Sequence, residues 1–358
     1  MNLIRSRDQK LIGAWLFIGM VMVFVQIQLG GITRLTGSGL SITRWEIVTG
    51  TVPPLNRTQW EDAFELYKAT PQYQHINQGM TLGEFKFIFF WEYIHRLWAR
   101  TMGFIFIIPL VIFLFRKSIT KGLLKRLMLV VAVAGAAAVF GWIMVKSGLE
   151  QRPWVNAYKL TIHLGLGILL FICLFITWLL HRSIEVIRVN LRLNRFLVFL
   201  FVLACIQVVF GGFVSGMKSA LNYPTWPQMN GEWIPSIILD KNHWNADNFL
   251  LYDKSGFMPA LTQFIHRMIA YVLAISSILF AVLWYQKNVE KWRWISFTLV
   301  GIIVVQVSLG ILTLLRSLGS IPVLYGTLHQ AFGILFLSFL VYLLTRFKSE
   351  NIKLNNKV

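Results

Sequence analysis

Apolar stretches of about 20 residues recur along the whole chain, and they restrict its fold more than any other feature does. The chain is 56% hydrophobic and only 14% charged. A backbone that crosses lipid must satisfy its own hydrogen bonds, so each stretch is expected to be an α-helix. The sequence therefore predicts an all-α polytopic membrane protein of about eight transmembrane helices, near residues 11–31, 87–115, 127–145, 158–180, 196–216, 259–285, 295–315 and 324–345.

Basic residues are concentrated in the two tails and in every second connection between the predicted spans, and the net charge is +19. The long connections 32–84 and 217–258 hold most of the acidic residues. By the positive-inside rule, we expect both termini to be cytoplasmic and the long connections to lie outside. The charge thus predicts topology, and no nucleic acid is expected as a partner. A short basic tail leads directly into the first span, which favours a bacterial cytoplasmic (inner) membrane.

The chain contains a weak internal repeat. Each half has a Gly-Gly pair at the end of its first predicted span, followed by Leu and Trp at matching spacings, and two histidine motifs. The repeat predicts two pseudo-symmetric four-helix bundles of equal orientation, residues 1–190 and 191–358. Helix packing alone explains the glycines equally well. The matching positions are Gly30-Gly31, Leu40, Trp45, His95 and His163 in the first half, and Gly211-Gly212, Leu221, Trp226, His266 and His329 in the second.

Four of the seven histidines fall at one depth of the predicted bilayer. His95, His163, His266 and His329 lie in the first turns of spans two, four, six and eight, which all run from outside to inside. A single histidine in a membrane helix commonly forms an interhelical hydrogen bond. Four that match by repeat and depth indicate a function, because ionisable groups at that depth are costly.

Two imidazoles that face each other across a helix bundle are the usual way to hold a haem iron from both sides. Zinc requires a third or fourth protein ligand, and neither half offers an obvious one. Copper favours cysteine or methionine at the ligand positions, which are absent here. The sequence therefore predicts two haem sites, with His95 and His163 in one half and His266 and His329 in the other.

The two halves differ three residues before the first histidine of each pair, where Glu92 corresponds to Gln263. Residues three apart share a helix face, so each side chain is expected near its own site. Only the carboxyl group can exchange a proton, which favours a reactive site in the first half and an electron-carrying site in the second. Alternatively, Glu92 pairs with Arg96 or Lys86, or faces outer water.

Several long motifs resemble those of the haem A synthase family, in order and over nearly the whole chain. The resemblance is to the mitochondrial and proteobacterial branch, because the cysteine pair found in an outer loop of other branches is absent. Both cysteines here, Cys173 and Cys205, fall inside predicted spans, where apolar packing is expected. The motifs are GGITRLTGSGLS from Gly30, FKFI from Phe85, EYIHR from Glu92, GWIMVKSGL from Gly141, LNYPTWP from Leu221 and GEWIP from Gly231.

The resemblance implies an oxidoreductase that converts haem O to haem A by successive hydroxylation of a ring methyl group to a formyl group. It implies that His266 and His329 ligate a resident haem B and that His95 and His163 ligate the substrate haem, with Glu92 as the catalytic residue. It also implies a role in terminal oxidase assembly, with haem O synthase and assembly factors as partners beside membrane lipid; the electron acceptor is unknown. Candidate contacts for the haem propionates are Arg34, Arg96, Lys146 and Arg152.

Two other functions are compatible with the histidine pattern. A bis-histidine di-haem electron carrier would use the same four histidines without a carboxylate at position 92. A transporter with parallel repeats would use them to relay protons or bind substrate, and it would contain no haem. No pair of spans broken by glycine or proline occurs at matching mid-membrane positions, which disfavours the transporter.

Overall fold

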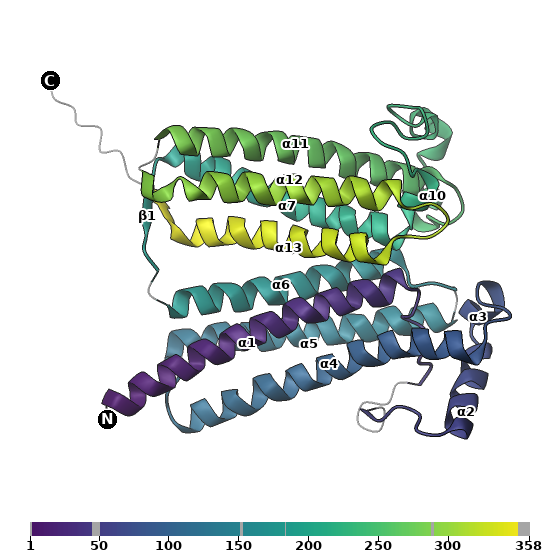
Figure 1. Cartoon of the computed structure of the whole chain (residues 1–358), viewed down its shortest axis with the longest axis horizontal. Helices are drawn as coiled ribbons and strands as arrows, with labels where there is room; N and C mark the ends of the chain where they lie inside the picture. The colour runs from purple at the N-terminus through teal and green to yellow at the C-terminus, as the bar shows by residue number, and fades with distance from the viewer. Residues whose placement is uncertain (1, 45–50, 151–152, 183, 288–289, 350–358) are drawn as a thin grey trace.

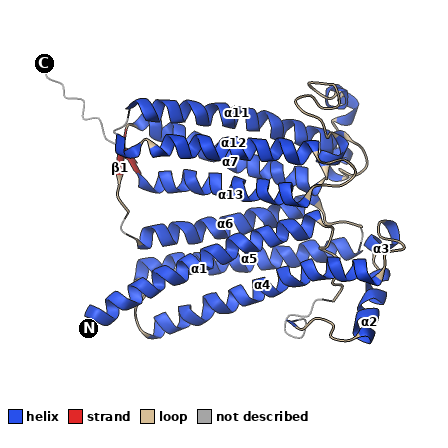
Figure 2. Cartoon of the chain, viewed as in Figure 1, coloured by secondary structure: helices blue, strands red, loops and turns tan. Residues whose placement is uncertain are grey.

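The computed structural model describes residues 2–44, 51–150, 153–182, 184–287 and 290–349. Within these ranges, eight long helices are apolar enough to cross a membrane, which confirms the predicted all-α polytopic membrane protein. Helices make up most of the described chain, and loops are concentrated in the connections (Figure 2). The eight are α1 (Asn2–Leu35), α4 (Leu82–Phe115), α5 (Lys121–Glu150), α6 (Ala157–His181), α7 (Leu191–Gly216), α11 (Phe257–Lys287), α12 (Trp294–Leu315) and α13 (Val323–Arg346).

The helices extend beyond the predicted spans, and this corrects the placement of the two glycine pairs. Helix α1 continues to Leu35 and α7 to Gly216, so both Gly-Gly pairs lie inside their helices rather than at the ends. Hydropathy marks only the apolar part of a helix, whereas polar side chains near its end can bond to the helix itself. The Thr33 hydroxyl, for example, donates to the carbonyl of Leu29 at 2.8 Å.

The spans pack in two groups of four that meet along four inner helices. In the first group, α1 packs on α4 and α6, and α5 packs on α6. In the second group, α7 packs on α11 and α13, and α12 also packs on α11 and α13. Between the groups, α6 contacts α7 and α13, while α1 contacts α13. In the internal repeat, α1 corresponds to α7 and α6 corresponds to α13. The α6–α7 contact therefore has the α13–α1 contact as its counterpart. Figure 1 shows α6 and α13 side by side in the middle of the molecule.

Small residues bring these inner helices unusually close together. A Cβ atom added to Gly216 would lie 2.6 Å from the Cβ of Ala157, and one added to Gly212 would lie 2.8 Å from Thr161 Oγ1. Such close approach is the usual means of helix packing in lipid. The junction between the groups therefore depends on small residues in α7 and α6. The equivalent contacts between α1 and α13 pair Gly31 with Gln330 and Gly326 with Leu35.

Both long connections fold at the same end of the helix bundle, where Figure 1 shows α2, α3 and α10. Helix α1 begins and α13 ends at the opposite end, where strands β1 (Ile187–Val189) and β2 (Phe347–Ser349) pair in parallel. The connections contain α2 (Arg57–Lys68), α3 (Pro71–His75), α8 (Ser219–Asn222), α9 (Ser236–Leu239), the 3-10 helix η2 (Lys241–His243) and α10 (Ala246–Leu250); a further 3-10 helix, η3 (Glu290–Trp292), precedes α12.

Candidate haem sites formed by two histidine pairs

The histidine pair of the second half brings α11 and α13 together. The rings of His266 and His329 have centroids 6.4 Å apart and planes inclined by 77°. Metal–imidazole bonds are about 2 Å long, so two rings that share one metal have centroids roughly 6 Å apart. The observed separation therefore fits an iron atom bound between the two rings. In the first half, His95 on α4 and His163 on α6 are likewise electrostatic neighbours.

The hydrogen bonds of the histidines leave a nitrogen available for a metal. His329 Nδ1 lies 3.0 Å from the carbonyl of Gln306, and His163 Nδ1 lies 3.0 Å from the carbonyl of Ala137. A carbonyl only accepts, so each Nδ1 carries the proton and each Nε2 keeps its lone pair, as metal-binding histidines require. His266 differs, because its Nε2 accepts from the Gln207 amide at 3.3 Å; a metal at this nitrogen would take the place of that hydrogen bond.

Each of the four histidines lies against a glycine on the preceding span. A Cβ atom on Gly141 would lie 2.9 Å from His163 Cε1, and one on Gly310 would lie 2.8 Å from His329 Cε1. Real Cβ atoms do not approach this closely, so a side chain at either position would displace the ring. A Cβ atom on Gly30 would lie 3.2 Å from His95 Nε2, and one on Gly211 would lie 3.3 Å from His266 Cε1.

These observations fit two haem groups with protein ligands on both faces of each iron. Among the described residues, no three His, Cys, Asp or Glu side chains gather in a group that would hold a metal ion by themselves. A histidine pair suffices for haem, because the porphyrin supplies the other four ligands. Of the remaining histidines, His181 bonds to the Gln9 carbonyl at 2.8 Å and His243 lies 3.1 Å from Asp240, so both are engaged away from the two pairs.

Glu92 is buried, with only 2% of its surface exposed, and both of its oxygens have partners. Its Oε1 accepts from Arg96 Nη2 at 2.5 Å, and its Oε2 accepts from the Ser41 hydroxyl at 2.7 Å and from the Ile42 backbone at 2.8 Å. Of the alternatives considered for this residue, the structure therefore shows the pairing with Arg96. Lys86 instead lies over the ring of Trp60. The carboxylate links α4, one turn before His95, to the first long connection.

In the second half, a neutral amide and a cation link the histidine-bearing helix α11 to the second long connection. The amide of Gln263, the counterpart of Glu92, donates to the Tyr223 carbonyl at 3.0 Å. Arg267, the counterpart of Arg96, donates to Tyr223 and to three further carbonyls of the loop. In both halves, residues flanking a candidate ligand histidine thus fasten a long connection to the helix that carries this histidine. The further acceptors are Thr225, Pro227 and Gln228, at 2.8 to 3.2 Å.

Replacing Arg267 with alanine is expected to lower the free energy of unfolding by about 2–4 kcal/mol, because the buried guanidinium is removed and four loop carbonyls lose a charged donor. Hydrogen exchange should accelerate at residues 223–228, and thermal unfolding of the solubilised protein should shift to lower temperature. Arg57→Ala is a matched control: its ion pair with Glu61 is exposed, so little stability should be lost. Equal effects of the two substitutions would contradict the anchoring role.

The structure describes three of the four candidate propionate contacts. Arg34 Nη2 donates to the carbonyls of Ser215 and Gly216 at 2.7 and 3.0 Å, across the junction between the halves. Arg96 is paired with Glu92, and Lys146 lies over the ring of Trp142. Contact with propionate stays a prediction for all of them. Arg152 lies outside the described residues, as does Trp45 of the repeat.

Two groups of residues were missed by reasoning from sequence. Gly141 and Gly310 occupy equivalent places in the repeat, so their signal was the repeat itself, but glycine is common in membrane helices. Arg267 occupies the position of the repeat that corresponds to Arg96, so the motif itself pointed to it. Its four carbonyl acceptors, however, depend on how a distant loop folds. Both cysteines are free and half-buried in their helices, as predicted.

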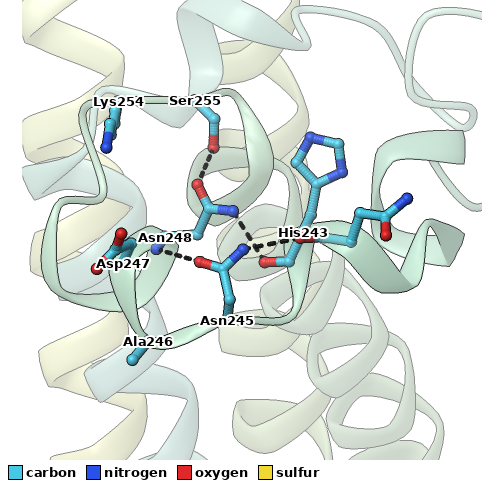
Figure 3. A pocket seen from close by; sticks show the side chains of 8 residues that line it. His243, Asn245, Ala246, Asp247, Asn248, Lys254 and Ser255 are labelled. Atoms are coloured by element: carbon cyan, nitrogen blue, oxygen red, sulfur yellow. Dashed lines mark hydrogen bonds between the residues drawn. The ribbon is translucent and has the colours of Figure 1, made fainter.

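A hollow of about 530 Å³ lies in the second long connection and contains none of the four histidines (Figure 3). Its polar groups bond to one another: the Asn248 backbone N–H donates to the Asn245 side-chain oxygen, and the Ser255 hydroxyl donates to the Asn248 side-chain oxygen. Figure 3 shows these bonds running around the hollow rather than into it. The hollow therefore belongs to the framework of the loop and not to the histidine sites.

Eight helices that are apolar enough to cross a membrane, with two half-buried histidine pairs toward one end, define a multi-pass membrane protein of the haem-binding class. The profile of the family described as cytochrome oxidase assembly protein matches residues 13–341. Heme A synthases of Brucella ovis and Brucella abortus are 36% identical over 342 residues, which cover 94% of this chain and 91% of theirs. That of Brucella anthropi is 35% identical. The chain belongs to the haem A synthase family.

Proposed function

We propose that this protein is a haem A synthase that oxidises a ring methyl group of haem O to a formyl group by successive hydroxylation. The observation that carries the proposal is the pair of histidine sites, one per half, on a chain whose relatives are heme A synthases. His266 and His329 would hold a resident haem B, and His95 and His163 would hold the substrate haem. Haem supplies the redox chemistry when bound.

An open first half supports its assignment as the substrate site. Helix α11 packs along α12, whereas within the described residues α4 and α5 make no comparable contact. Aligned on Gly141 and Gly310, residues 134–138 of α5 are all alanine or glycine, while residues 303–307 of α12 are isoleucine, valine and glutamine. Small side chains leave more room beside His163 than beside His329. The farnesyl tail of haem O needs such room, and a site open to lipid spares it a passage through water.

Glu92 is the residue we assign to proton transfer during the oxidation of the methyl group. Its carboxylate is one helical turn from His95, and its two oxygens bond to Arg96 and to the loop residues Ser41 and Ile42. The counterpart Gln263 cannot exchange a proton, so only the first half carries this group. A carboxylate held by several donors has a defined position, which general acid–base chemistry requires.

The cellular setting follows from the same proposal. The long connections would face outward and both termini would lie in the cytoplasm of a bacterium, with the protein in the inner membrane. Haem O synthase would deliver the substrate, and terminal oxidase assembly factors would receive the product. The electron acceptor is a separate partner whose identity these residues do not specify.

The test is to purify the protein from cells that supply haem O and to identify every extracted haem by chromatography and mass. The wild type should contain haem B and haem A. In Glu92→Gln, haem A should fall by about 100-fold or more while haem O or a hydroxylated intermediate accumulates, because an acid–base group contributes at least that much. The matched control is Glu84→Gln on the same helix, because glutamine also serves in the capping box that Glu84 forms with Thr81.

The alternative outcomes separate the competing functions. Haem B alone, with supplied haem O unchanged in wild type and variant, would contradict the synthase and leave a bis-histidine electron carrier. A colourless purified protein would contradict both and favour the transporter. Unchanged haem A in Glu92→Gln would keep the synthase but remove Glu92 from the proton transfer.

A further inference from the structure

Two cations lie together at the outer end of the junction between the halves, without an acidic partner among the described residues. Arg34, near the end of α1, bonds through Nη2 to the carbonyls of Ser215 and Gly216 at the end of α7. Its Nε is fully buried and has no hydrogen-bond partner. A guanidinium carries five N–H donors, so donors remain for a further acceptor.

Lys218 follows directly after α7 and shares an acceptor with Arg34. The Lys218 backbone N–H donates to the Ser215 carbonyl at 3.2 Å, the same oxygen that accepts from Arg34. Burial, and secondarily the charge of Arg34, lower the pKa of Lys218. Two neighbouring cations that are both withdrawn from water repel each other, and an anion between them would offset that cost.

The backbone of Lys218 is also unusual. Its φ is +52°, in the left-handed region that glycine adopts more readily, and its counterpart in the first half is Gly37, with φ +70°. A lysine in this conformation costs stability on the order of 1 kcal/mol relative to glycine. The side chain makes no hydrogen bond or ion pair with the described residues that would offset the strain.

The position of both cations relative to the histidines is set by the helices. Arg34 is four residues beyond Gly30, which lies against His95, so it is about 6 Å further along α1. Gly31, in the same turn as Arg34, lies against Gln330, the neighbour of His329. Lys218 is two turns beyond Gly211, which lies against His266. Both cations thus lie outward of the histidines, between the two sites.

We propose that Arg34 and Lys218 form a carboxylate-binding site at the junction of the halves, occupied by a propionate of a haem bound by an adjacent histidine pair. The inference rests on the proposed haem binding, and it adds Lys218, which no motif assigned. Each half contributes one cation, so the site requires both halves to be packed together. Charge-assisted bonds to a carboxylate are stronger than neutral ones and suit a buried setting.

The test uses the purified protein with its haem and measures the rate of haem loss to excess apomyoglobin and the midpoint potential of the retained haem. In Lys218→Met, haem loss should be about tenfold faster, as expected for one lost charge-assisted bond. The midpoint potential should fall, because a cation stabilises the reduced, more negative haem. Lys218→Arg should restore both values. Lys241→Met, at an exposed lysine of the same connection, is the matched control.

Lys218→Gly separates charge from backbone strain. It should lose haem as quickly as Lys218→Met while unfolding at the same or a higher temperature than the wild type, because the left-handed conformation suits glycine. Faster loss of haem B places the carboxylate on the resident haem, and faster loss of haem O places it on the substrate. Wild-type haem retention in both Lys218→Met and Lys218→Gly would overturn the proposal. A protein that keeps haem normally but leaves haem O unconverted would overturn the proposed function alone, and a haem-free wild type would overturn both.

Discussion

Replacing His266 or His329 with alanine is expected to remove the resident haem, whereas the same change at His95 or His163 should leave it in place. Each variant would lack one of the two imidazoles that would hold the haem iron, and loss of a metal ligand weakens binding by more than about 100-fold. Under the proposed assignment, the affected haem would be the one held by the altered pair, because the pairs lie in separate halves. The haem retained per protein, from reduced-minus-oxidised difference spectra and extraction, measures the effect.

A third histidine provides the control for this experiment. His181 ends α6 and bonds to the Gln9 carbonyl, at the end of the bundle opposite the two pairs. His181→Ala should therefore keep both haem groups. If His95→Ala lost haem B as completely as His266→Ala, the assignment of resident and substrate sites to separate halves would be wrong.

Adding a single methyl group beneath a ligand histidine is expected to weaken one haem site without touching the ligand itself. In Gly310→Ala, the new Cβ would lie 2.8 Å from His329 Cε1, so the ring must move and its bond to the Gln306 carbonyl must weaken. Disturbing the group that orients a ligand histidine costs about 10–100-fold in metal affinity. The rate of haem B loss from the purified variant should rise by that factor.

A second glycine on the same helix makes the matched control. A Cβ on Gly301 of α12 would have no neighbour within 4 Å, so Gly301→Ala should retain haem normally. Alanine inside a helix should even stabilise it by about 0.5–1 kcal/mol. If Gly310→Ala loses haem and Gly301→Ala keeps it, the loss is caused by the contact with His329 and not by adding a methyl group to α12. Equal haem retention in Gly310→Ala and Gly301→Ala would contradict the close packing.

The first half offers the same comparison for the substrate haem. Gly141→Ala places a Cβ 2.9 Å from His163 Cε1, while Gly135→Ala on the same helix meets no atom within 4 Å. Gly141→Ala should slow the conversion of haem O and leave haem B in place. A loss of haem B in this variant would show that the two sites are not independent.

The eight spans were predictable because lipid leaves a crossing backbone only one regular way to satisfy its hydrogen bonds. The four ligand candidates were predictable because a repeat carried them in matched positions. Helix ends were predicted less well. Thr33 and the residues after it continue α1 beyond its apolar part, where hydropathy gives no signal.

From the amino-acid sequence alone we could predict the fold class, the pairing of His95 with His163 and of His266 with His329, and the difference between Glu92 and Gln263. The contacts of those side chains depend instead on how distant segments of the chain pack in three dimensions. Glu92 meets Ser41 and Ile42 because a loop some 50 residues away in the chain folds back onto α4. Arg34 and Lys218 come together only where the two halves pack, because each half supplies one of them. Periodicity records which face of a helix is apolar, but not which distant polar group will lie against it.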